Sequence, residues 1–203
     1  MITVSDLGLR AGARALLTNV TFRVQPGDRI GLVGRNGAGK TTLTKTLAGE
    51  TLPAAGQITR SGEIGYLPQD PRTGDLDTLA RDRVLSARGL DELARKMAKA
   101  QVEMSEKPDD PEVLARYGRL EERFVALDGY GAEAEASRIC SNLGLPTRAL
   151  EQPLGTLSGG QRRRIELARI LFSGATTLLL DEPTNHLDAD SIVWLRDFLR
   201  KHQ

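Results

Sequence analysis

Residues 34–41 read GRNGAGKT, a glycine-rich loop that leaves few folds open to this chain. The loop matches the pattern G-x-x-x-x-G-K-[ST] without a gap. The apolar run RIGLVG at 29–34 predicts a strand that leads into the loop. KTTLTKTLAGE at 40–50 predicts a helix that leaves the loop and ends near Gly49. A strand, a phosphate loop and a helix in this order predict an α/β fold that binds a nucleoside triphosphate.

The residue types of this loop suit phosphate chemistry. Glycines let backbone N–H groups wrap around phosphates, the ammonium of Lys40 neutralises the β- and γ-phosphates, and the hydroxyl of Thr41 binds Mg²⁺. Such a fold also needs a carboxylate near the metal, at the end of a neighbouring apolar strand. Three leucines followed by Asp181 and Glu182 supply it. Asp181 is the candidate Mg²⁺ residue, and Glu182 is the candidate base for an attacking water.

Period-two alternation predicts further strands in the first 70 residues. Val20, Phe22 and Val24 alternate with polar neighbours and end in the turn QPGD. The segments GQITR and IGYLPQ are also strand candidates, and the second ends at Gln69. These strands predict an antiparallel β portion beside the nucleotide-binding core.

Residues 89–127 change to a helical pattern. Apolar residues recur at alternating spacings of three and four, first over 90–104 and then over 113–127. Between these two seams Asp110 is a good N-cap, and Pro111 suits the first position of a helix. The pattern predicts an antiparallel helical hairpin with arms roughly 25 Å long at 1.5 Å per residue.

A second glycine pair opens the last quarter of the chain, in LSGGQ at 157–161. Ser158 and Gln161 form the S-x-x-Q capping box, which predicts a helix start, and the free N–H groups of a helix start can bind anions. TTLLLDEP then predicts a buried strand. Helices are predicted over 131–143 and 189–201.

Composition narrows the class of protein without naming a function. The chain has 203 residues, enough for one or two domains, and its formal charge of +1 gives no overall attraction to nucleic acid or anionic membrane. The single cysteine, Cys140, cannot form an internal disulfide, which fits a cytoplasmic location. No apolar run approaches the roughly 18 residues needed to cross a bilayer, so direct membrane insertion is not expected.

Together, GRNGAGKTT, YLPQD, LSGGQRRR and LLLDEPTNHLD resemble the motifs of an ATP-binding-cassette (ABC) ATPase: Walker A, Q-loop, signature, Walker B and D-loop. The resemblance covers nearly the whole chain. It implies a P-loop NTPase (RecA-like) core, an antiparallel β subdomain, a helical subdomain, and ATP and Mg²⁺ as ligands. It also implies that residues 1–88 hold the β subdomain, Walker A and Q-loop, residues 89–127 the inserted hairpin, and residues 128–203 the signature helix, Walker B and D-loop.

The resemblance also implies roles for individual residues. Catalysis falls to Glu182, Gln69 and Lys40, and Mg²⁺ binding to Thr41, Gln69 and Asp181. In this family two cassettes join head to tail, so that the signature of one meets the ATP held by the other. The implied partner is therefore a second cassette, in the same polypeptide or in a homodimer. The nucleotide-binding residues of both faces are Gly34, Arg35, Asn36, Gly37, Ala38, Gly39, Lys40, Thr41, Thr42, Ser158, Gly159, Gly160, Gln161 and Asp188.

DEPTNHLD at 181–188 resembles the ABC-F branch, whose members carry two cassettes in one polypeptide and act on ribosomes as translation factors or antibiotic-resistance proteins. The predicted hairpin lies where ABC-F proteins insert an arm that touches the ribosome and its rRNA. The alternative is the ATPase subunit of an ABC membrane transporter, which needs a membrane partner. Arg116, Arg119 and Arg123 share one helical face, which fits either a solvated surface or a stripe that binds RNA phosphates.

Two features depart from the family pattern. LRAGARALL stands where an aromatic residue usually stacks on adenine, and Arg10 or Arg14 is the candidate to stack in its place. After the helix at 189–201 the family continues with another strand and a switch histidine. The resemblance thus implies that the chain is most of the first cassette of a longer protein, truncated before that histidine. We therefore expect the chain alone to bind Mg-ATP weakly and to hydrolyse little of it.

Overall fold

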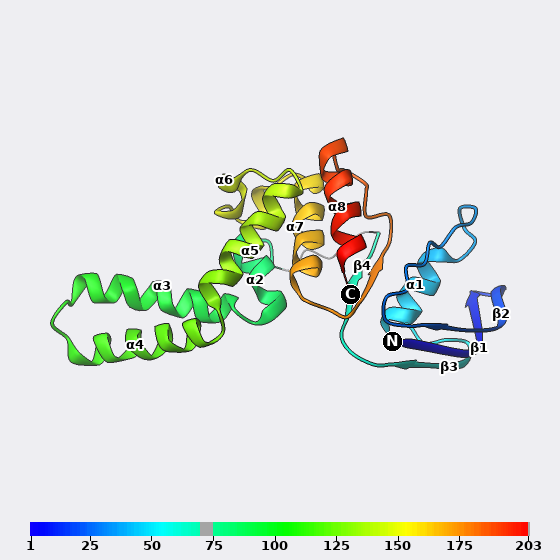
Figure 1. The fold of residues 1–203 in the computed structure, drawn as a ribbon, viewed down its shortest axis with the longest axis horizontal. Coiled ribbons are helices and arrows are strands. Elements are labelled where there is room, and N and C mark those ends of the chain that lie inside the picture. The colour runs from blue at the N-terminus through cyan, green and yellow to red at the C-terminus, as the bar shows by residue number, and fades with distance from the viewer. Residues whose placement is uncertain (70–74, 203) are drawn as a thin grey trace. The chain divides into compact units, whose positions relative to one another are not determined.

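The structure is a computed structural model that describes residues 1–69 and 75–202. By its internal contacts the chain, drawn in Figure 1, divides into two compact units. The β unit comprises Met1–Pro71, Gly174–Asn185 and Arg196–Gln203, and the helical unit comprises Arg72–Ser173 and His186–Leu195.

A three-stranded antiparallel sheet in the order β2-β1-β3 forms one part of the β unit (Figure 1). Val4 of the central strand pairs with Phe22 on one side and with Ile58 on the other. Val20, Phe22 and Val24 are half-buried and their polar neighbours exposed, as the alternation predicts. The antiparallel β portion is therefore confirmed, with strands at Ile2–Ala11 (β1), Arg14–Val24 (β2) and Ala55–Arg60 (β3).

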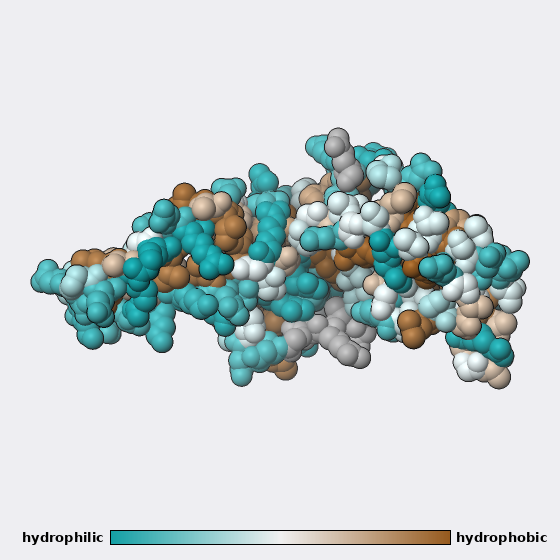
Figure 2. Space-filling model, turned by 90° about the horizontal axis from the view of Figure 1, so that it is seen from below, coloured by the Kyte–Doolittle hydropathy of each residue, from teal (hydrophilic) through white to brown (hydrophobic). Residues whose placement is uncertain are grey.

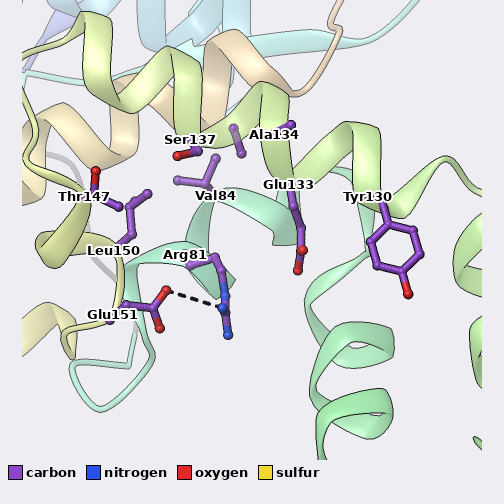
Figure 3. A pocket seen from close by; sticks show the side chains of 10 residues that line it. Arg81, Val84, Tyr130, Glu133, Ala134, Ser137, Thr147, Leu150 and Glu151 are labelled. Carbon is purple, nitrogen blue, oxygen red and sulfur yellow. Dashed lines mark hydrogen bonds and ion pairs between the residues drawn. The ribbon is translucent and has the colours of Figure 1, made fainter.

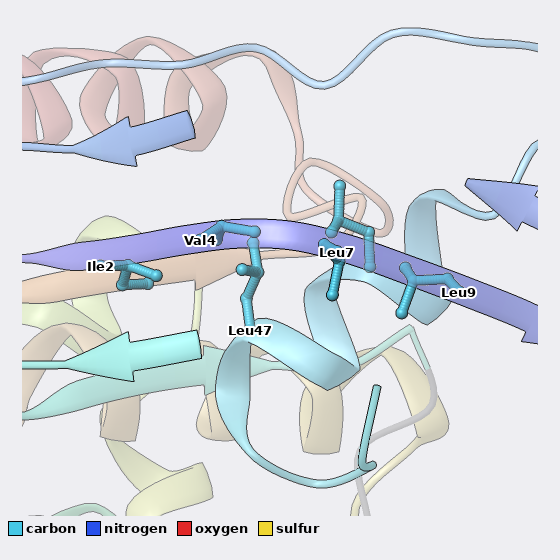
Figure 4. Packing of buried hydrophobic residues seen from close by; sticks show 6 residues of the cluster. Ile2, Val4, Leu7, Leu9 and Leu47 are labelled. Atoms are coloured by element: carbon cyan, nitrogen blue, oxygen red, sulfur yellow. The ribbon is translucent and has the colours of Figure 1, made fainter. Parts of the chain in front are cut away.

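Helix α1, Lys40–Ala48, packs on this sheet through an apolar cluster. Side chains along one face of β1 form a buried cluster with Leu43 and Leu47 of the helix. Figure 4 shows Leu47 beside the labelled β1 residues. The helix ends where the sequence predicts, because Gly49 adopts a left-handed conformation with φ of 89° as its C-cap. The buried residues from β1 are Ile2, Val4, Leu7 and Leu9.

Strands β4, Ile64–Leu67, and β5, Thr177–Leu180, form a separate parallel pair. Leu67 lies opposite Leu180 at the carboxyl end of the pair. Helix α1 contacts both strands. Both strands were predicted, and they bring the segment after Leu67 and the segment after Leu180 to the same edge.

The prediction of a strand at 29–34 is wrong. Within the residues that the structure describes, this segment belongs to neither sheet, and Ile30, Leu32 and Val33 are exposed. The segment is instead held by the side chain of Arg29, whose Nε and Nη2 donate to the carbonyls of Leu199 (3.2 Å) and Arg200 (2.5 Å). A strand needs a neighbouring backbone to satisfy its N–H and C=O groups, and apolar composition alone does not supply one.

The helical unit packs around α7, whose main neighbours are α2 and α5. The α7 residues Ile165, Leu167 and Phe172 are fully or almost fully buried. The predicted helices near 131–143, after Ser158 and over 189–201 are confirmed; the short helices α2 and α6 were not predicted. The elements are α2 (Ala80–Leu85), the 3₁₀ turn η1 (Ser86–Arg88), α5 (Gly129–Asn142), α6 (Thr147–Leu150), the 3₁₀ turn η2 (Leu154–Thr156), α7 (Gly159–Phe172) and α8 (Ala189–Lys201), which runs from the helical unit into the β unit.

Helices α3, Asp91–Glu106, and α4, Pro111–Ala126, pack side by side as a hairpin (Figure 1). The Asp110 carboxylate caps α4 by accepting from the N–H groups of Glu112 (2.9 Å) and Val113 (3.3 Å). The predicted pair of helices and its cap are confirmed. The buried seam includes Leu93, Ala100, Val113 and Phe124, whereas Leu127 at its end is exposed.

The surface of the hairpin is mostly hydrophilic, with scattered hydrophobic residues that include Val102, Leu114 and Val125 (Figure 2). The charged side chains pair locally, as in the ion pair of Arg116 with Glu103 across the two helices. Among the described residues, no helix combines the length and the apolar character needed to cross a membrane.

A surface cavity of about 370 Å³ lies among α2, α5 and α6 of the helical unit (Figure 3). Arg81 and Glu151 form an ion pair of 3.4 Å at its rim, and Tyr130 and Glu133 project from α5. None of its lining residues is a predicted site residue, so the candidate active site lies elsewhere.

Candidate active site

The phosphate loop turns tightly before helix α1. Gly37 and Gly39 have φ values of 76° and 97°, a region that glycine enters at no steric cost. The N–H of Ala38 donates to the carbonyl of Arg35 at 3.1 Å and closes the turn between them. A Cβ on Gly39 would lie 3.1 Å from Cδ1 of Leu16, so the close approach of β2 also favours glycine there.

Lys40 holds the two ends of the loop together. Its ammonium donates to the carbonyls of Gly34 (2.7 Å) and Arg35 (3.1 Å). Helix α1 begins at Lys40, and its N-cap, Gly39, gives no side-chain cap. The first N–H groups of a helix have no acceptor within the helix, so those of Lys40 and Thr41 suit an anion at this end.

The acidic pair follows β5 directly. Asp181 is only 9% exposed, and its N–H extends the β4–β5 ladder by donating to the carbonyl of Leu67 at 3.0 Å. Glu182 is exposed and has a left-handed φ of 48°. This conformation is uncommon outside glycine, and such residues cluster at functional sites.

Tyr66 shows that α1 and the acidic strand end are neighbours. Burial raises the pKa of the Tyr66 phenol, the nearby Thr44 hydroxyl opposes this shift, and the carboxylates of Glu50 and Asp181 add to it. Thr44 belongs to α1, four residues after Lys40. The structure therefore brings the helix of the phosphate loop close to Asp181.

Gln69 lies at the same edge of the parallel pair. It follows Leu67 by two residues, Glu182 follows Leu180 by two, and Leu67 and Leu180 are direct neighbours. Gln69 is exposed. In open α/β sheets, ligands bind at the carboxyl ends of parallel strands. The last residue of the YLPQD motif, Asp70, lies outside the described residues.

The helical unit holds the second glycine pair at the start of α7. The capping box is confirmed: the N–H of Ser158 donates to Oε1 of Gln161 at 2.9 Å, and the N–H of Gln161 donates to Oγ of Ser158 at 3.2 Å. A Cβ on Gly159 would meet nothing within 4 Å, whereas one on Gly160 would lie 3.4 Å from Cβ of His186. Gly159 thus faces open space at a helix start.

Two of the arginines after the glycine pair donate hydrogen bonds to backbone carbonyls of the helical unit. Arg162 donates to the carbonyl of Leu157 at 2.7 Å, and Arg164 donates to that of Gly144 at 2.9 Å. The neighbouring Asp188 carboxylate caps α8 by accepting from the N–H of Ser191 at 2.8 Å. That bond, together with the Ser191 hydroxyl and Arg164, holds the pKa of Asp188 below its ordinary value.

The sequence did not single out Asn185 and Pro183 as functional residues. The N–H of Asn185 donates to the carbonyl of Glu182 at 3.2 Å, and its side-chain Nδ2 donates to Oε2 of Glu182 at 2.7 Å. Pro183 stands at the second position of this turn, which proline favours. The signal in the sequence for this turn was a proline followed two residues later by an asparagine. The guanidinium of Arg10, one of the two candidates for adenine stacking, donates to the carbonyl of Ala13 at 2.9 Å.

Comparison with known proteins identifies the family. Residues 17–185 match the family described as ABC transporter. The chain belongs to this family of ATP-binding cassettes.

Curated relatives of this cassette are ABC-F type proteins. The tylosin resistance ATP-binding protein TlrC of Streptomyces fradiae is 39% identical over 195 residues, covering 94% of this chain and 36% of TlrC. The energy-dependent translational throttle protein EttA of Escherichia coli (strain K12) is 38% identical over 195 residues, covering 92% of this chain and 34% of EttA. The chain spans about a third of the length of these relatives.

Solved structures agree on the fold of the cassette. The ATP-binding subunit of an ABC transporter gives a TM-score of 0.71 at 20% identity, covering 100% of this chain and 74% of that one. A dimeric ATP-binding cassette in a post-hydrolysis state, bound to ADP and Pi, gives a TM-score of 0.62 at 18% identity. The match covers 99% of this chain and 82% of that one. The P-loop NTPase fold expected from the sequence is confirmed.

The residues of the β unit fit Mg-ATP. The uncapped start of α1 and the Lys40 ammonium suit phosphates. The Thr41 hydroxyl and the Asp181 carboxylate are hard oxygen donors, and Mg²⁺ in nucleotide sites usually takes one or two carboxylates together with phosphate oxygens. Thr41 lies in the first turn of α1, the helix that contacts β5. The two donors therefore come from neighbouring elements.

Proposed function

We propose that this cassette binds Mg-ATP and hydrolyses it within a cytoplasmic ABC-F protein that acts on the ribosome, in translation regulation or in protection from antibiotics. The observation that carries the proposal is the placement of the phosphate-loop helix beside Asp181, with Glu182 next in the chain. The names of the relatives supply the biological context, since one is a translational throttle and another a resistance protein.

Under this proposal the phosphate loop holds the triphosphate. The N–H groups of residues 34–42 bind the phosphate oxygens, for which the Ala38 N–H leaves the carbonyl of Arg35. The Lys40 ammonium leaves the carbonyls of Gly34 and Arg35 for the β- and γ-phosphates. Thr41, Asp181 and Gln69 hold Mg²⁺, which when bound neutralises charge on the phosphates.

Glu182 orients the attacking water and accepts a proton from it. Gln69, two residues beyond the partner of Leu180 on the neighbouring strand, lies at the same edge and contacts the water or the γ-phosphate. A base of this kind contributes typically 10²–10⁴-fold to the rate. Removal of the base in Glu182→Gln should therefore lower kcat by about 10²–10⁴-fold.

The signature residues Ser158, Gly159, Gly160 and Gln161 complete the site of a partner cassette. Three features support this role: the start of α7 carries partial positive charge, Gly159 faces open space, and a related cassette has been solved as a dimer. Asp188 joins the same surface through the D-loop. The partner is a second cassette, in the same polypeptide or in a homodimer, and one cassette alone is poorly active.

The hairpin of α3 and α4, within residues 89–127, is the arm that contacts the ribosome. It presents a mainly hydrophilic surface (Figure 2). Arg119 and Arg123 are exposed, whereas Arg116 pairs with Glu103 and is partly neutralised. Contacts to RNA phosphates are salt-dependent, so this contact should weaken as salt rises.

The experiment uses the complete natural protein with Glu182→Gln, which keeps the size of the side chain and removes the base. Loaded with ATP and spun through a sucrose cushion with ribosomes, the variant is expected to pellet with them. A Lys40→Met variant, impaired in ATP binding, is the matched control and is expected to stay in the supernatant.

Each outcome distinguishes the two functional classes. ATP-dependent pelleting of Glu182→Gln, lost in Lys40→Met, supports the ribosomal role. Tight ATP trapping without pelleting refutes it, and co-purification with a membrane protein would then assign the cassette to a transporter. Undiminished ATP turnover by Glu182→Gln would instead refute the role of Glu182 as base.

A further inference from the structure

Asn185 binds the candidate base inside a four-residue turn. Its side-chain Nδ2 lies 2.7 Å from Oε2 of Glu182, and its backbone N–H donates to the Glu182 carbonyl at 3.2 Å. Pro183, between them, has its φ fixed near −65° by its ring. The left-handed φ of 48° at Glu182 sets the direction in which its side chain leaves the backbone. Backbone and side chain therefore both hold Asn185 against Glu182.

This contact restricts rotation of the Glu182 carboxylate, which would turn a base away from its water. The last torsion of a glutamate is broad and roughly two-fold, so an unsupported carboxylate rotates. A hydrogen bond to Oε2 fixes the carboxylate plane and thereby the direction of Oε1. The donor is an amide, which carries no charge, so it orients the carboxylate without supplying a competing acid.

We infer that Asn185 is a positioning residue for Glu182, and that it aims the carboxylate at the attacking water. The inference rests on the proposed ATP hydrolysis. In that step the water oxygen forms a bond to the γ-phosphorus, and the bond from phosphorus to the β,γ-bridging oxygen breaks. ADP leaves with the bonding electron pair, and the water proton passes to Glu182. Asn185 takes no proton and touches no reacting atom.

The test replaces Asn185 with alanine in the complete natural protein and follows ATP hydrolysis and ATP binding separately. Misplacement of a catalytic group by about 1 Å can cost on the order of 10²-fold. We expect kcat to fall about 10- to 100-fold, while KM and the dissociation constant for ATP stay within about twofold. Asn185→Asp keeps the shape and replaces the donor by an acceptor, so it should lose at least as much.

Two controls separate positioning from a general structural effect. Asn142→Ala removes another asparagine whose Nδ2 binds one acceptor, the carbonyl of Arg138, and it should leave kcat unchanged. In a Glu182→Gln background, Asn185→Ala should cost nothing more, because there is no base left to aim. A thermal melt of each variant establishes that it folds.

The outcomes are distinct. Wild-type kcat in both Asn185 variants overturns the inference and leaves the proposed hydrolysis intact. An equal loss in the wild-type and Glu182→Gln backgrounds, or a parallel loss of ATP affinity or of folding, also overturns it. If the wild-type protein does not hydrolyse ATP, or if Glu182→Gln hydrolyses it normally, the proposed function itself fails.

Discussion

Arg83 and Glu166 join helix α2 to the signature helix α7 through a buried ion pair. Nε of Arg83 donates to Oε1 of Glu166 at 2.5 Å, and Nη2 donates to Oε2 at 3.1 Å. Arg169 donates to the same carboxylate at 3.0 Å. Glu166 is 2% exposed, so these two guanidinium groups replace the water that its charge would otherwise require.

Replacement of Arg83 by methionine should destabilise the helical unit. Methionine keeps much of the packing volume but leaves Glu166 buried with Arg169 as its remaining arginine partner among these contacts. Breaking a buried pair costs about 3–5 kcal/mol, and because Arg83 is a quarter exposed we expect about 2–3 kcal/mol. Urea denaturation measures the loss. Arg196→Met, which breaks an exposed pair with Asp197, should cost under about 1 kcal/mol. Equal losses of stability in the two variants would contradict a stabilising role for the pair of Arg83 with Glu166.

Asp110 should stabilise the hairpin as an N-cap. Its carboxylate accepts from the N–H groups of Glu112 and Val113. Loss of such a cap costs about 1 kcal/mol, so Asp110→Ala should lower the free energy of unfolding by about that amount. Asp109→Ala is the matched control, since Asp109 is an exposed neighbour of the same charge. If both variants lose stability equally, charge rather than capping is responsible.

Local chemistry let the sequence predict the ends of several elements. The capping box at Ser158 and Gln161, the Asp110 cap and the left-handed Gly49 all act over a few residues. A pattern of this range is fully visible in the sequence, and the fold class followed from the motifs. The strand at 29–34 failed for the opposite reason, because a strand depends on a partner that its own residues do not specify.

Contacts distant in sequence were invisible for the same reason. Arg83 and Glu166 are 83 residues apart, and nothing in either local pattern indicates the pair. The left-handed φ of Glu182 is also not readable from residue types, so the hold of Asn185 on that carboxylate emerged only from the structure. The catalytic and ligand-binding roles assigned to individual residues stay predictions.

Cys140 should be nearly inert in the folded protein. Burial raises the pKa of its thiol from 9.0 to about 12. Each pKa unit is a factor of ten, so below pH 9 the folded chain holds about 10³-fold less thiolate than the unfolded one. Iodoacetamide at pH 8 should therefore label Cys140 slowly in buffer and rapidly in urea. Rapid labelling of folded protein would contradict this, and Cys140→Ala gives the background.

The same shift predicts how the thiol affects stability at high pH. The folded pKa lies above the unfolded value, so the folded state holds the proton more tightly. This contribution to stability is complete below about pH 9 and is lost as the pH rises toward 12. Comparison of wild type with Cys140→Ala by urea denaturation from pH 7 to 10 should show a steeper decline in the wild type. Parallel curves would show that the thiol is not protonated preferentially in the folded state.

Gly159→Asp should separate folding from partner-dependent hydrolysis. A Cβ there meets nothing within 4 Å, and a carboxylate in the first turn of α7 interacts favourably with the helix dipole. The melting temperature of the variant should therefore not fall. The same charge would repel the γ-phosphate of a partner cassette, so ATP turnover by the complete natural protein should fall at least tenfold while ATP affinity holds. Gly118→Asp, also at an open glycine but within α4, is the control and should keep its turnover. Normal turnover in Gly159→Asp would exclude the signature from a partner's site.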